Sequence, residues 1–219
     1  MSGYVITIMD NPKSVAVANR CIESAKYQKL EVNHWPATTP KDNLDQLLEE
    51  NNILDTKSFE SVYSKKENVI STFLSHLFLW KECIKKNEII TIFEHDAIMT
   101  GSLPASLSFN KVITLARPSY GKFRVPNSFG SNALTQADYF KGAHGYMISP
   151  DGAKMLIDKL NIVPALPADL YFNLDYFPWL QEYYPWIVEA KDTFTTIQKV
   201  EGCVAKHNYN EKYGIINAV

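Results

Sequence analysis

The segment Ile89-Ile90-Thr91-Ile92-Phe93-Glu94-His95-Asp96 decides the fold class of this chain. Its first five residues, Ile89 to Phe93, form a β-branched and aromatic run, which is typical of a strand that is covered on both faces. The run ends abruptly at two carboxylates and a histidine. In open α/β sheets, ligands bind beyond the carboxyl ends of such strands. The same segment therefore predicts a buried central strand and a functional site at its end.

The sequence on either side of this strand alternates between helix and strand patterns. Between Glu67 and Lys86, apolar residues recur at three- and four-residue steps, which predicts a long amphipathic helix. Further strands are expected at 4–8, 31–35, 112–116 and 143–148, helices at 14–28 (capped by Ser14), after Asp42 and after Ser149, and a long mobile loop at 119–132. This alternation predicts an α/β fold with a Rossmann-like, mostly parallel central sheet flanked by helices.

Composition limits the number of domains and the classes of partner. The chain has 219 residues, and no linker-like segment divides it, so we expect one domain over 1–219. A formal net charge of -2 argues against nucleic acid as a partner. No stretch reaches the roughly 18 apolar residues that a membrane span needs, and no signal peptide pattern precedes the first strand. Cys21, Cys83 and Cys203 suit reduced thiols. The sequence thus predicts a cytoplasmic protein without a transmembrane segment, compatible with work at a membrane surface.

Glu94 and Asp96 are the first candidates for chemistry. In an extended segment, alternate side chains point to the same side, so these two carboxylates converge while His95 points away. Carboxylate oxygens suit Mg²⁺ or Mn²⁺, which keep open positions for the phosphate oxygens of a nucleotide. A solvated pair of loop acids is the alternative interpretation of so short a motif, and the tripeptide alone leaves it open.

Several segments resemble glycosyltransferase family 25, the lipooligosaccharide and collagen galactosyltransferase group. Leu74-Ser75-His76-Leu77-Phe78-Leu79-Trp80 followed by Phe93-Glu94-His95-Asp96-Ala97 is similar to the family pattern SHL-x-LW … EDDA. The stretch from Gly142 to Ala153 resembles G-T-x-A-Y-L-I-S-x-x-G-A, Pro167-Ala168-Asp169 resembles P-x-D, and Tyr4-Val5-Ile6-Thr7-Ile8 resembles the opening Y-V-I-N-L. The motifs follow the family's order over nearly the whole chain.

The resemblance implies a GT-A fold and a metal-dependent, inverting transfer from a UDP-sugar. The donated hexose would be galactose or glucose first, and the acceptor a glycan or a lipid-linked saccharide. Asp96 is then the direct ligand of Mn²⁺ or Mg²⁺, Glu94 joins it or contacts the ribose, and His207 completes the metal shell. Asp169 is the candidate base that accepts the proton of the acceptor hydroxyl, with Asp175 as the fallback. An ordinary N-cap or helix-dipole acid is the alternative role of Asp169.

Donor contacts are expected from Lys13, which only approximately matches the family's basic residue after the first strand, and from His144 and Tyr146. His76 is expected to be a hydrogen-bonded histidine at the edge of the core. The aromatic residues between Tyr171 and Trp186 are expected to lie mostly in the core, with a minority lining the acceptor site.

The sequence departs from the family pattern in three places, and two other functions stay open. The Cys or Gly that commonly precedes the Ser-His pair is replaced by Thr72-Phe73-Leu74, a difference that packing can explain. His95 replaces the middle acid of the family motif, and the basic residue is matched only approximately by Lys13 and Arg20. The last two departures favour a catalytically inactive carbohydrate-binding or scaffolding protein with the transferase fold. A metal-dependent phosphohydrolase is the other alternative, although the sequence near Asp96 lacks the additional acids of a two-metal site.

Overall fold

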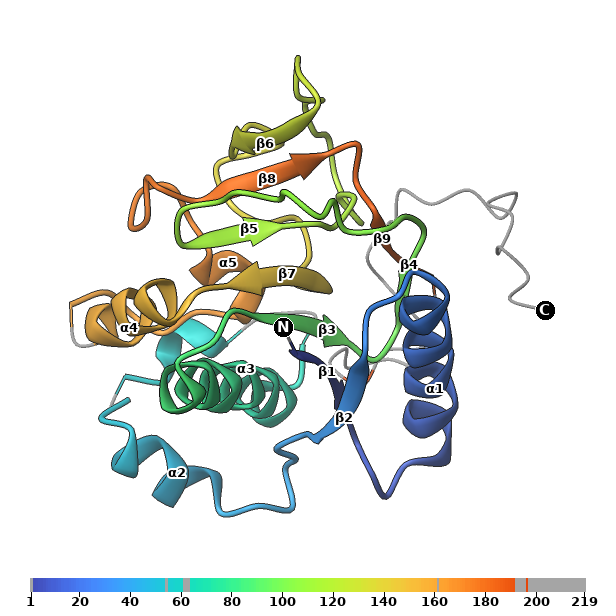
Figure 1. The fold of residues 1–219 in the computed structure, drawn as a ribbon. Coiled ribbons are helices and arrows are strands. Elements are labelled where there is room, and N and C mark those ends of the chain that lie inside the picture. The colour runs from blue at the N-terminus through green and yellow to red at the C-terminus, as the bar shows by residue number, and fades with distance from the viewer. Residues whose placement is uncertain (1, 54, 61–63, 161, 192–195, 197–219) are drawn as a thin grey trace.

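A seven-stranded sheet with the order β2-β1-β3-β7-β5-β8-β6 is the centre of the protein (Figure 1). The computed structural model describes residues 2–53, 55–60, 64–160, 162–191 and 196. The strands of the sheet are β1 (Ser2–Thr7), β2 (Val32–Pro36), β3 (Ile90–Glu94), β5 (Val112–Thr114), β6 (Gly130–Ala133), β7 (Gly145–Ile148) and β8 (Gln181–Tyr184). A second sheet in the described part pairs β4 (Ala97–Met99) with β9 (Val188–Ala190).

The central sheet is mixed, but most of its strands share one direction. β1 pairs in parallel with β2 and β3, and β5 pairs in parallel with β8. β7 lies antiparallel between β3 and β5, and β6 is antiparallel to β8. Only β7 and β6 therefore run against the rest of the described sheet. The predicted α/β class with a Rossmann-like, mostly parallel sheet is confirmed.

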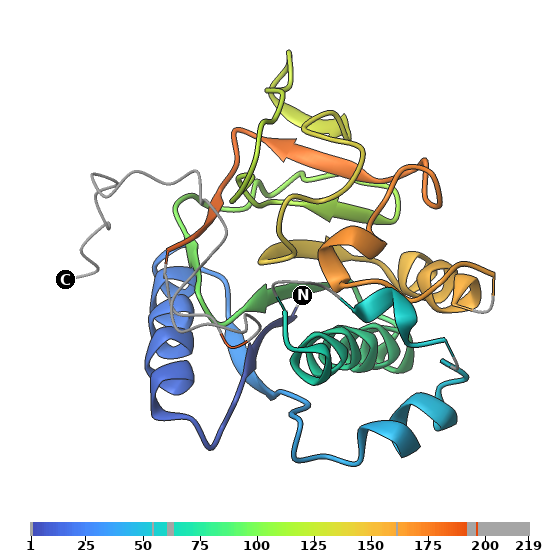
Figure 2. The same cartoon turned by 180° about the vertical axis from the view of Figure 1, so that it is seen from behind.

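Helices cover both faces of the sheet because the strands bury side chains on both. The helices are α1 (Pro12–Tyr27), α2 (Leu44–Glu50), α3 (Lys66–Lys86), α4 (Pro150–Lys159) and α5 (Ala168–Tyr171), and Lys57–Phe59 forms a 3-10 turn. Along β1, Val5 points into the cluster that α1 covers, whereas Tyr4 and Ile6 point into the cluster under α3. Viewed from behind, α1 lies on one side of β1 to β3, and α3 and α4 lie on the other (Figure 2).

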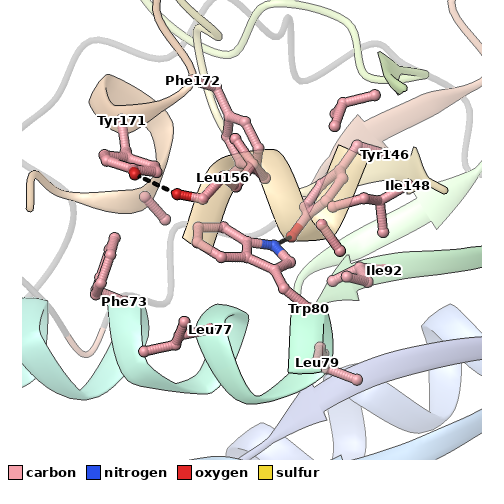
Figure 3. Packing of buried hydrophobic residues seen from close by; sticks show 14 of the residues in the cluster. Phe73, Leu77, Leu79, Trp80, Ile92, Tyr146, Ile148, Leu156, Tyr171 and Phe172 are labelled. Atoms are coloured by element: carbon pink, nitrogen blue, oxygen red, sulfur yellow. Dashed lines mark hydrogen bonds between the residues drawn. The ribbon is translucent and has the colours of Figure 1, made fainter. Parts of the chain in front are cut away.

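The larger core is formed where α3 meets α4, α5 and the sheet. Phe73, Leu77 and Trp80 lie on one face of α3 and are fully buried, as their three- and four-residue spacing predicts. Trp80 stacks on Tyr171 of α5 with the ring centroids 5.8 Å apart, and Phe172 packs edge-on against it. Figure 3 shows these side chains gathered above α3. In the described part of the chain, no helix is long and apolar enough to cross a membrane.

Three predicted details differ in the structure. Asn11, not Ser14, caps α1 by accepting hydrogen bonds from the backbone N–H groups of Lys13 and Ser14. Asn43 caps α2, while the Asp42 carboxylate accepts from the backbone N–H of Thr39. Residues 119–132 are not irregular throughout, because β6 begins at Gly130 and pairs with β8. In each case the backbone groups find a different partner from the one expected, either another nearby polar side chain or a neighbouring strand.

Candidate active site

Glu94, at the end of β3, lies close enough to Asp96 and to Asp169 of α5 for its charge to act on both. Glu94 is the last residue of β3, and His95 and Asp96 form the turn that leads into β4. The premise that 94–96 is extended is therefore wrong at its last two residues. The carboxylates still act on one another, because the charge of Glu94 raises the pKa of both Asp96 and Asp169. The structure thus joins two acids predicted from one motif with a third from a distant motif.

Glu94 is held in its ionised form by the groups around it. Its Oε1 lies 3.3 Å from Nε2 of His76, and its side chain keeps 29% of its surface exposed. Burial raises the pKa of Glu94, but the hydrogen bond from His76, together with the neighbouring rings of His144 and His95, outweighs burial and leaves the pKa below its usual value. Glu94 therefore presents a negative charge to the site.

Asp96 has the opposite electrostatic environment. Burial and then the charge of Glu94 raise its pKa to about 7, and Arg20 of α1 opposes this rise. Its Oδ1 is buried and has no hydrogen-bond partner among the residues that the structure describes. A buried carboxylate oxygen without a donor is costly in the free protein, so this atom is suited to a cation that arrives with a ligand.

His95 points to the side of the first strand and helix. Its Nδ1 lies 2.8 Å from Oγ of Ser14, which also accepts a hydrogen bond from the backbone N–H of Ile8. Burial lowers the pKa of His95, although Glu94 opposes this effect. The residue that replaces the family's middle acid thus fastens the end of β3 to the start of α1.

Asp169 lies in the short helix α5 and contacts the loop that follows β5. Its Oδ2 accepts a hydrogen bond of 2.5 Å from the hydroxyl of Tyr120, and its Oδ1 accepts one from the backbone N–H of Leu170. Burial raises the pKa of Asp169, the bond from Tyr120 lowers it, and Glu94 raises it again, with a net rise. Pro167, not Asp169, stands at the N-cap of α5, but Asp169 lies in the first turn, so its alternative role as a helix-dipole acid stays open.

The predicted donor contacts lie in three different environments. His144 is buried, and its charge lowers the pKa of Glu94. Gly142, at a φ of 111°, lets the chain pass so close to that ring that an added Cβ would lie 2.5 Å from Nδ1. Tyr146 is fully buried in the core, where its hydroxyl bonds to Trp80 and His76, so it reaches the site through His76. Lys13 is exposed in the first turn of α1.

Two further predicted residues add little to the described site. His207 lies outside the described residues, as does Cys203. Asp175 is exposed, and its backbone N–H bonds to the side chain of Asn173. Within the described ranges there is no group of three or more His, Cys, Asp or Glu side chains that could hold a metal by itself. A cation at Asp96 would therefore need other ligands, such as the phosphate oxygens of a substrate and water, which is a common arrangement for Mg²⁺.

The sequence did not identify two neighbours of the acids as site residues. Tyr120 begins a Gly- and Ser-rich segment, where a single tyrosine gives no pattern. His76 carries a recognisable signal, because it stands four residues before Trp80 in the SHL-x-LW segment, but apolar periodicity alone assigns it to the core. Both become visible only once α3, α5 and the strands are in place.

Comparison with known proteins supports the family that the motifs resemble. Residues 4–111 match glycosyltransferase family 25 (LPS biosynthesis protein), which confirms the resemblance over this range. The range includes Lys13, His76, Glu94 and Asp96, and it ends before His144 and Asp169. No curated protein sequence matches the chain.

Solved structures give weaker likenesses. A glycosyltransferase involved in glycosylation of the major capsid of PBCV-1 aligns with a TM-score of 0.45 and 7% identity, over 89% of this chain and 95% of that one. A mutant Drosophila β-1,4-galactosyltransferase 7 in complex with manganese, UDP-Gal and xylobiose aligns with a TM-score of 0.37 and 9% identity, over 80% and 68%. CTP:phosphocholine cytidylyltransferase from Streptococcus pneumoniae (LicC) aligns with a TM-score of 0.37 and 11% identity, over 85% and 91%. Because these TM-scores are low, the functions of these proteins are not assigned to this chain.

Proposed function

We propose that this protein, whose residues 4–111 match glycosyltransferase family 25, is a GT-A-type transferase. It moves a hexose, with galactose or glucose as the first candidates, from a UDP-sugar to a hydroxyl of a glycan or lipid-linked saccharide. The reaction depends on Mn²⁺ or Mg²⁺ and inverts the anomeric carbon. The proposed compartment is the cytoplasm, which suits the free, buried thiols of Cys21 and Cys83.

The Oδ1 of Asp96, which is buried and has no hydrogen-bond partner within the described ranges, carries this proposal. A divalent cation would satisfy this buried oxygen, which no described residue does, and the ionised Glu94 beside it adds a second negative charge. When bound, the cation supplies positive charge that stabilises the departing diphosphate. Asp96 is the direct ligand, and Glu94 either joins it or accepts a hydrogen bond from the ribose. His207 remains a proposed additional ligand.

Asp169 is the proposed base. A carboxylate with a raised pKa accepts a proton more readily than an ordinary one, so burial makes Asp169 a stronger base than an exposed aspartate. The hydrogen bond from Tyr120 fixes one oxygen of the Asp169 carboxylate. Tyr120 lies outside α5 and so orients this carboxylate from another part of the chain. An inverting displacement needs such a base on the face of the sugar opposite the diphosphate, with the metal ligands at the other end of the pocket.

Aromatic rings at the β6–β8 edge of the sheet are the proposed wall for the acceptor. Phe129, which is 81% exposed, stacks on Tyr184, which in turn meets Trp186 edge-on at 5.2 Å. Exposed ring faces suit the apolar faces of sugars. His144 and Lys13 are the proposed donor contacts, and His144 is the nearer to the acids because its charge acts on Glu94.

Calorimetry with UDP, with and without Mn²⁺, tests the proposal. We expect the wild-type protein to bind UDP at least about tenfold more tightly with Mn²⁺, and Asp96→Ala to lose this gain while remaining folded. Asp138→Ala is the matched control, because the Asp138 side chain is 79% exposed and its ion partner, Arg124, is 72% exposed. UDP affinity that ignores Mn²⁺, or an Asp96→Ala variant that binds like the wild type, would contradict the metal site.

Release of UDP from UDP-galactose and UDP-glucose then separates the enzyme from an inactive binding protein. A transferase with an activated donor hydrolyses it slowly even without acceptor, and this background should require Mn²⁺. Tight binding of UDP-sugars without any release of UDP, with glycan acceptors present or absent, would favour the binding protein.

A further inference from the structure

We propose that Trp80, Tyr146 and His76 form a directed chain of hydrogen bonds that fixes the tautomer of His76 and makes this histidine the positioning residue for Glu94. The chain links α3 and β7 to the last residue of β3. The hydrogen-bond chain stands on the geometry alone, and its consequence for donor binding rests on the proposed function.

The three bonds are continuous and buried. The indole Nε1 of Trp80 donates a hydrogen bond to the hydroxyl of Tyr146 (Figure 3), and the two atoms lie 2.8 Å apart. That hydroxyl lies 2.9 Å from Nδ1 of His76. Nε2 of His76 then lies 3.3 Å from Oε1 of Glu94. Trp80, Tyr146 and His76 are all fully buried, so water does not replace any of these partners.

One arrangement of the hydrogens gives every donor and acceptor in these three bonds a partner. Indole nitrogen is only a donor, so the Tyr146 oxygen must accept from Trp80. The single hydroxyl hydrogen of Tyr146 then needs an acceptor, and Nδ1 of His76 is its other partner in the described structure. Nδ1 must therefore be unprotonated, which leaves the hydrogen of the neutral ring on Nε2. That hydrogen points at Oε1 of Glu94.

Other arrangements of hydrogens leave a buried group unsatisfied. A hydrogen on Nδ1, whether the ring is neutral or charged, would force the Tyr146 oxygen to accept twice and leave its own O–H without an acceptor. The neutral ring with hydrogen on Nδ1 would also turn the lone pair of Nε2 toward the ionised Glu94. The indole of Trp80, a donor that cannot reverse, thus sets the direction of the whole chain.

Packing holds the rings of this chain in place. The rings of His76 and Tyr146 lie 5.7 Å apart at an angle of 27°, and Tyr146 meets Phe172 at 4.9 Å. His76 and Trp80 are four residues apart on α3, so both project from the same face of one helix. The Trp80 and His76 positions of the SHL-x-LW segment therefore serve one group, the Glu94 carboxylate.

The consequence for the site is that one oxygen of Glu94 is fixed and the other is available. In the described part of the chain, His76 is the hydrogen-bond donor to this carboxylate, and 29% of the side chain remains exposed. A carboxylate fixed by one bond presents its second oxygen in a defined direction to a ribose hydroxyl or a cation. Without the bond from His76, the Glu94 side chain would become ordered only when the ligand binds, and this ordering would weaken the affinity for the ligand.

Nitrogen-15 NMR of the histidine rings, combined with UDP calorimetry, tests the chain. In the wild-type protein at neutral pH, we expect His76 to show the Nε2–H tautomer, because Tyr146 donates to Nδ1. In Tyr146→Phe, Nδ1 loses its donor, so a mixture of tautomers should appear and UDP affinity in Mn²⁺ should fall about tenfold. Tyr171→Phe is the matched control, because Tyr171 is equally buried in the same core and its hydroxyl bonds to the carbonyl of Leu156 at 2.7 Å. It should leave both readouts unchanged.

A second pair of variants separates positioning from packing. In His76→Gln, the side-chain amide can still donate to Glu94, so most of the UDP affinity should be retained, whereas His76→Leu keeps the bulk and should lose it. A wild-type His76 protonated on Nδ1, a Tyr146→Phe spectrum identical to the wild type, or equal affinities of the Gln and Leu variants would overturn the proposal. If wild-type His76 shows the expected tautomer but the protein binds no UDP, the proposed donor fails while the hydrogen-bond chain stands.

Discussion

At the scale of single residues, the acids at the end of β3 differ more in environment than in chemistry. Glu94 receives a hydrogen bond from a buried histidine, and its pKa is lowered. Asp96, two residues on, has a buried oxygen without a partner among the described residues, and its pKa is raised to about 7. The physical difference is whether a donor compensates the loss of water. Ionisation of Asp96 is therefore unfavourable in the free protein.

The stability of the free protein should depend on pH through Asp96. Its pKa is raised on folding, so its contribution is favourable at about pH 4 and is lost as the pH rises through about 7. Asp96→Asn removes this ionisation, so it should raise the free energy of unfolding by roughly 1–3 kcal/mol at pH 8 and change it little at pH 4. Urea unfolding at both pH values, with Asp138→Asn as the exposed control, measures the difference. A variant less stable than the wild type at pH 8 would contradict the buried orphan carboxylate.

The role of Asp169 can be separated from its hydrogen bonds. Asp169→Asn keeps the shape of the side chain and an oxygen that can accept from Tyr120, but it removes basicity. We expect hexose transfer to fall by roughly 10²-fold or more while UDP affinity changes little. Initial rates of transfer and calorimetry on the same preparation provide the two readouts. Near-wild-type transfer would remove Asp169 as the base and direct the search to Asp175.

At the scale of elements, the segment 119–132 connects the site to the edge of the sheet. Tyr120 fixes its beginning to Asp169, and β6 fixes its end to β8. The buried Glu182 of β8 reinforces this end, because its Oε1 accepts from the backbone N–H groups of Thr135 and Gln136 just after β6. Between the two anchors, most residues are exposed, including Val125 and Phe129. A segment fixed at both ends and exposed in the middle has the features of a lid.

We expect residues 121–129 to become more protected from hydrogen exchange when UDP-sugar and Mn²⁺ are added. Closing over the donor would exclude water from an activated sugar and bury the N–H groups of this segment. β6 provides an internal control, because its pairing with β8 already exists in the free protein and its protection should change little. Equal exchange of 121–129 with and without donor would count against a lid.

At the scale of the whole molecule, the position of the site follows from the sheet order. β1 and β3 run in parallel and end together, which places the first turn of α1 beside the turn at His95 and Asp96. β7 runs antiparallel on the other side of β3, and its start brings His144 to the same edge. The acids therefore lie at a junction of α1, α5 and three strands, and their titration is a property of the assembled fold.

Binding of metal and donor should accordingly weaken on acidification. Metal ligands bind as the deprotonated form, and the pKa of Asp96 in the free protein is raised to about 7. Below that pH, the apparent affinity for Mn²⁺ with UDP should fall by up to about tenfold per pH unit, and above it the affinity should become constant. Calorimetry at pH 6, 7 and 8 measures this dependence. An affinity that is constant from pH 6 to 8 would show that Asp96 does not titrate on binding.

Much of the architecture and part of the site could be predicted from local patterns. The strand that ends at Glu94, the helix from Lys66 to Lys86 and the Ser149 cap of α4 follow from apolar spacing and capping residues. The ends of segments were less predictable, because Asn11 and Ser14 are both good caps and the choice depends on His95, which contacts Ser14. Family motifs supplied Asp169, which local patterns alone would not distinguish from other acids.

The sequence by itself determined the α/β class, the buried strand and the acids at its end, because periodicity and residue type act within a few neighbouring residues. Only the tertiary structure decided that β7 runs against β3, that Tyr120 bonds to Asp169 49 residues away, and that His76 joins Tyr146 70 residues away to Glu94. Such contacts depend on how helices pack on the sheet, and the burial they create sets the pKa of each acid. The chemistry of each carboxylate was therefore decided by what the fold places around it.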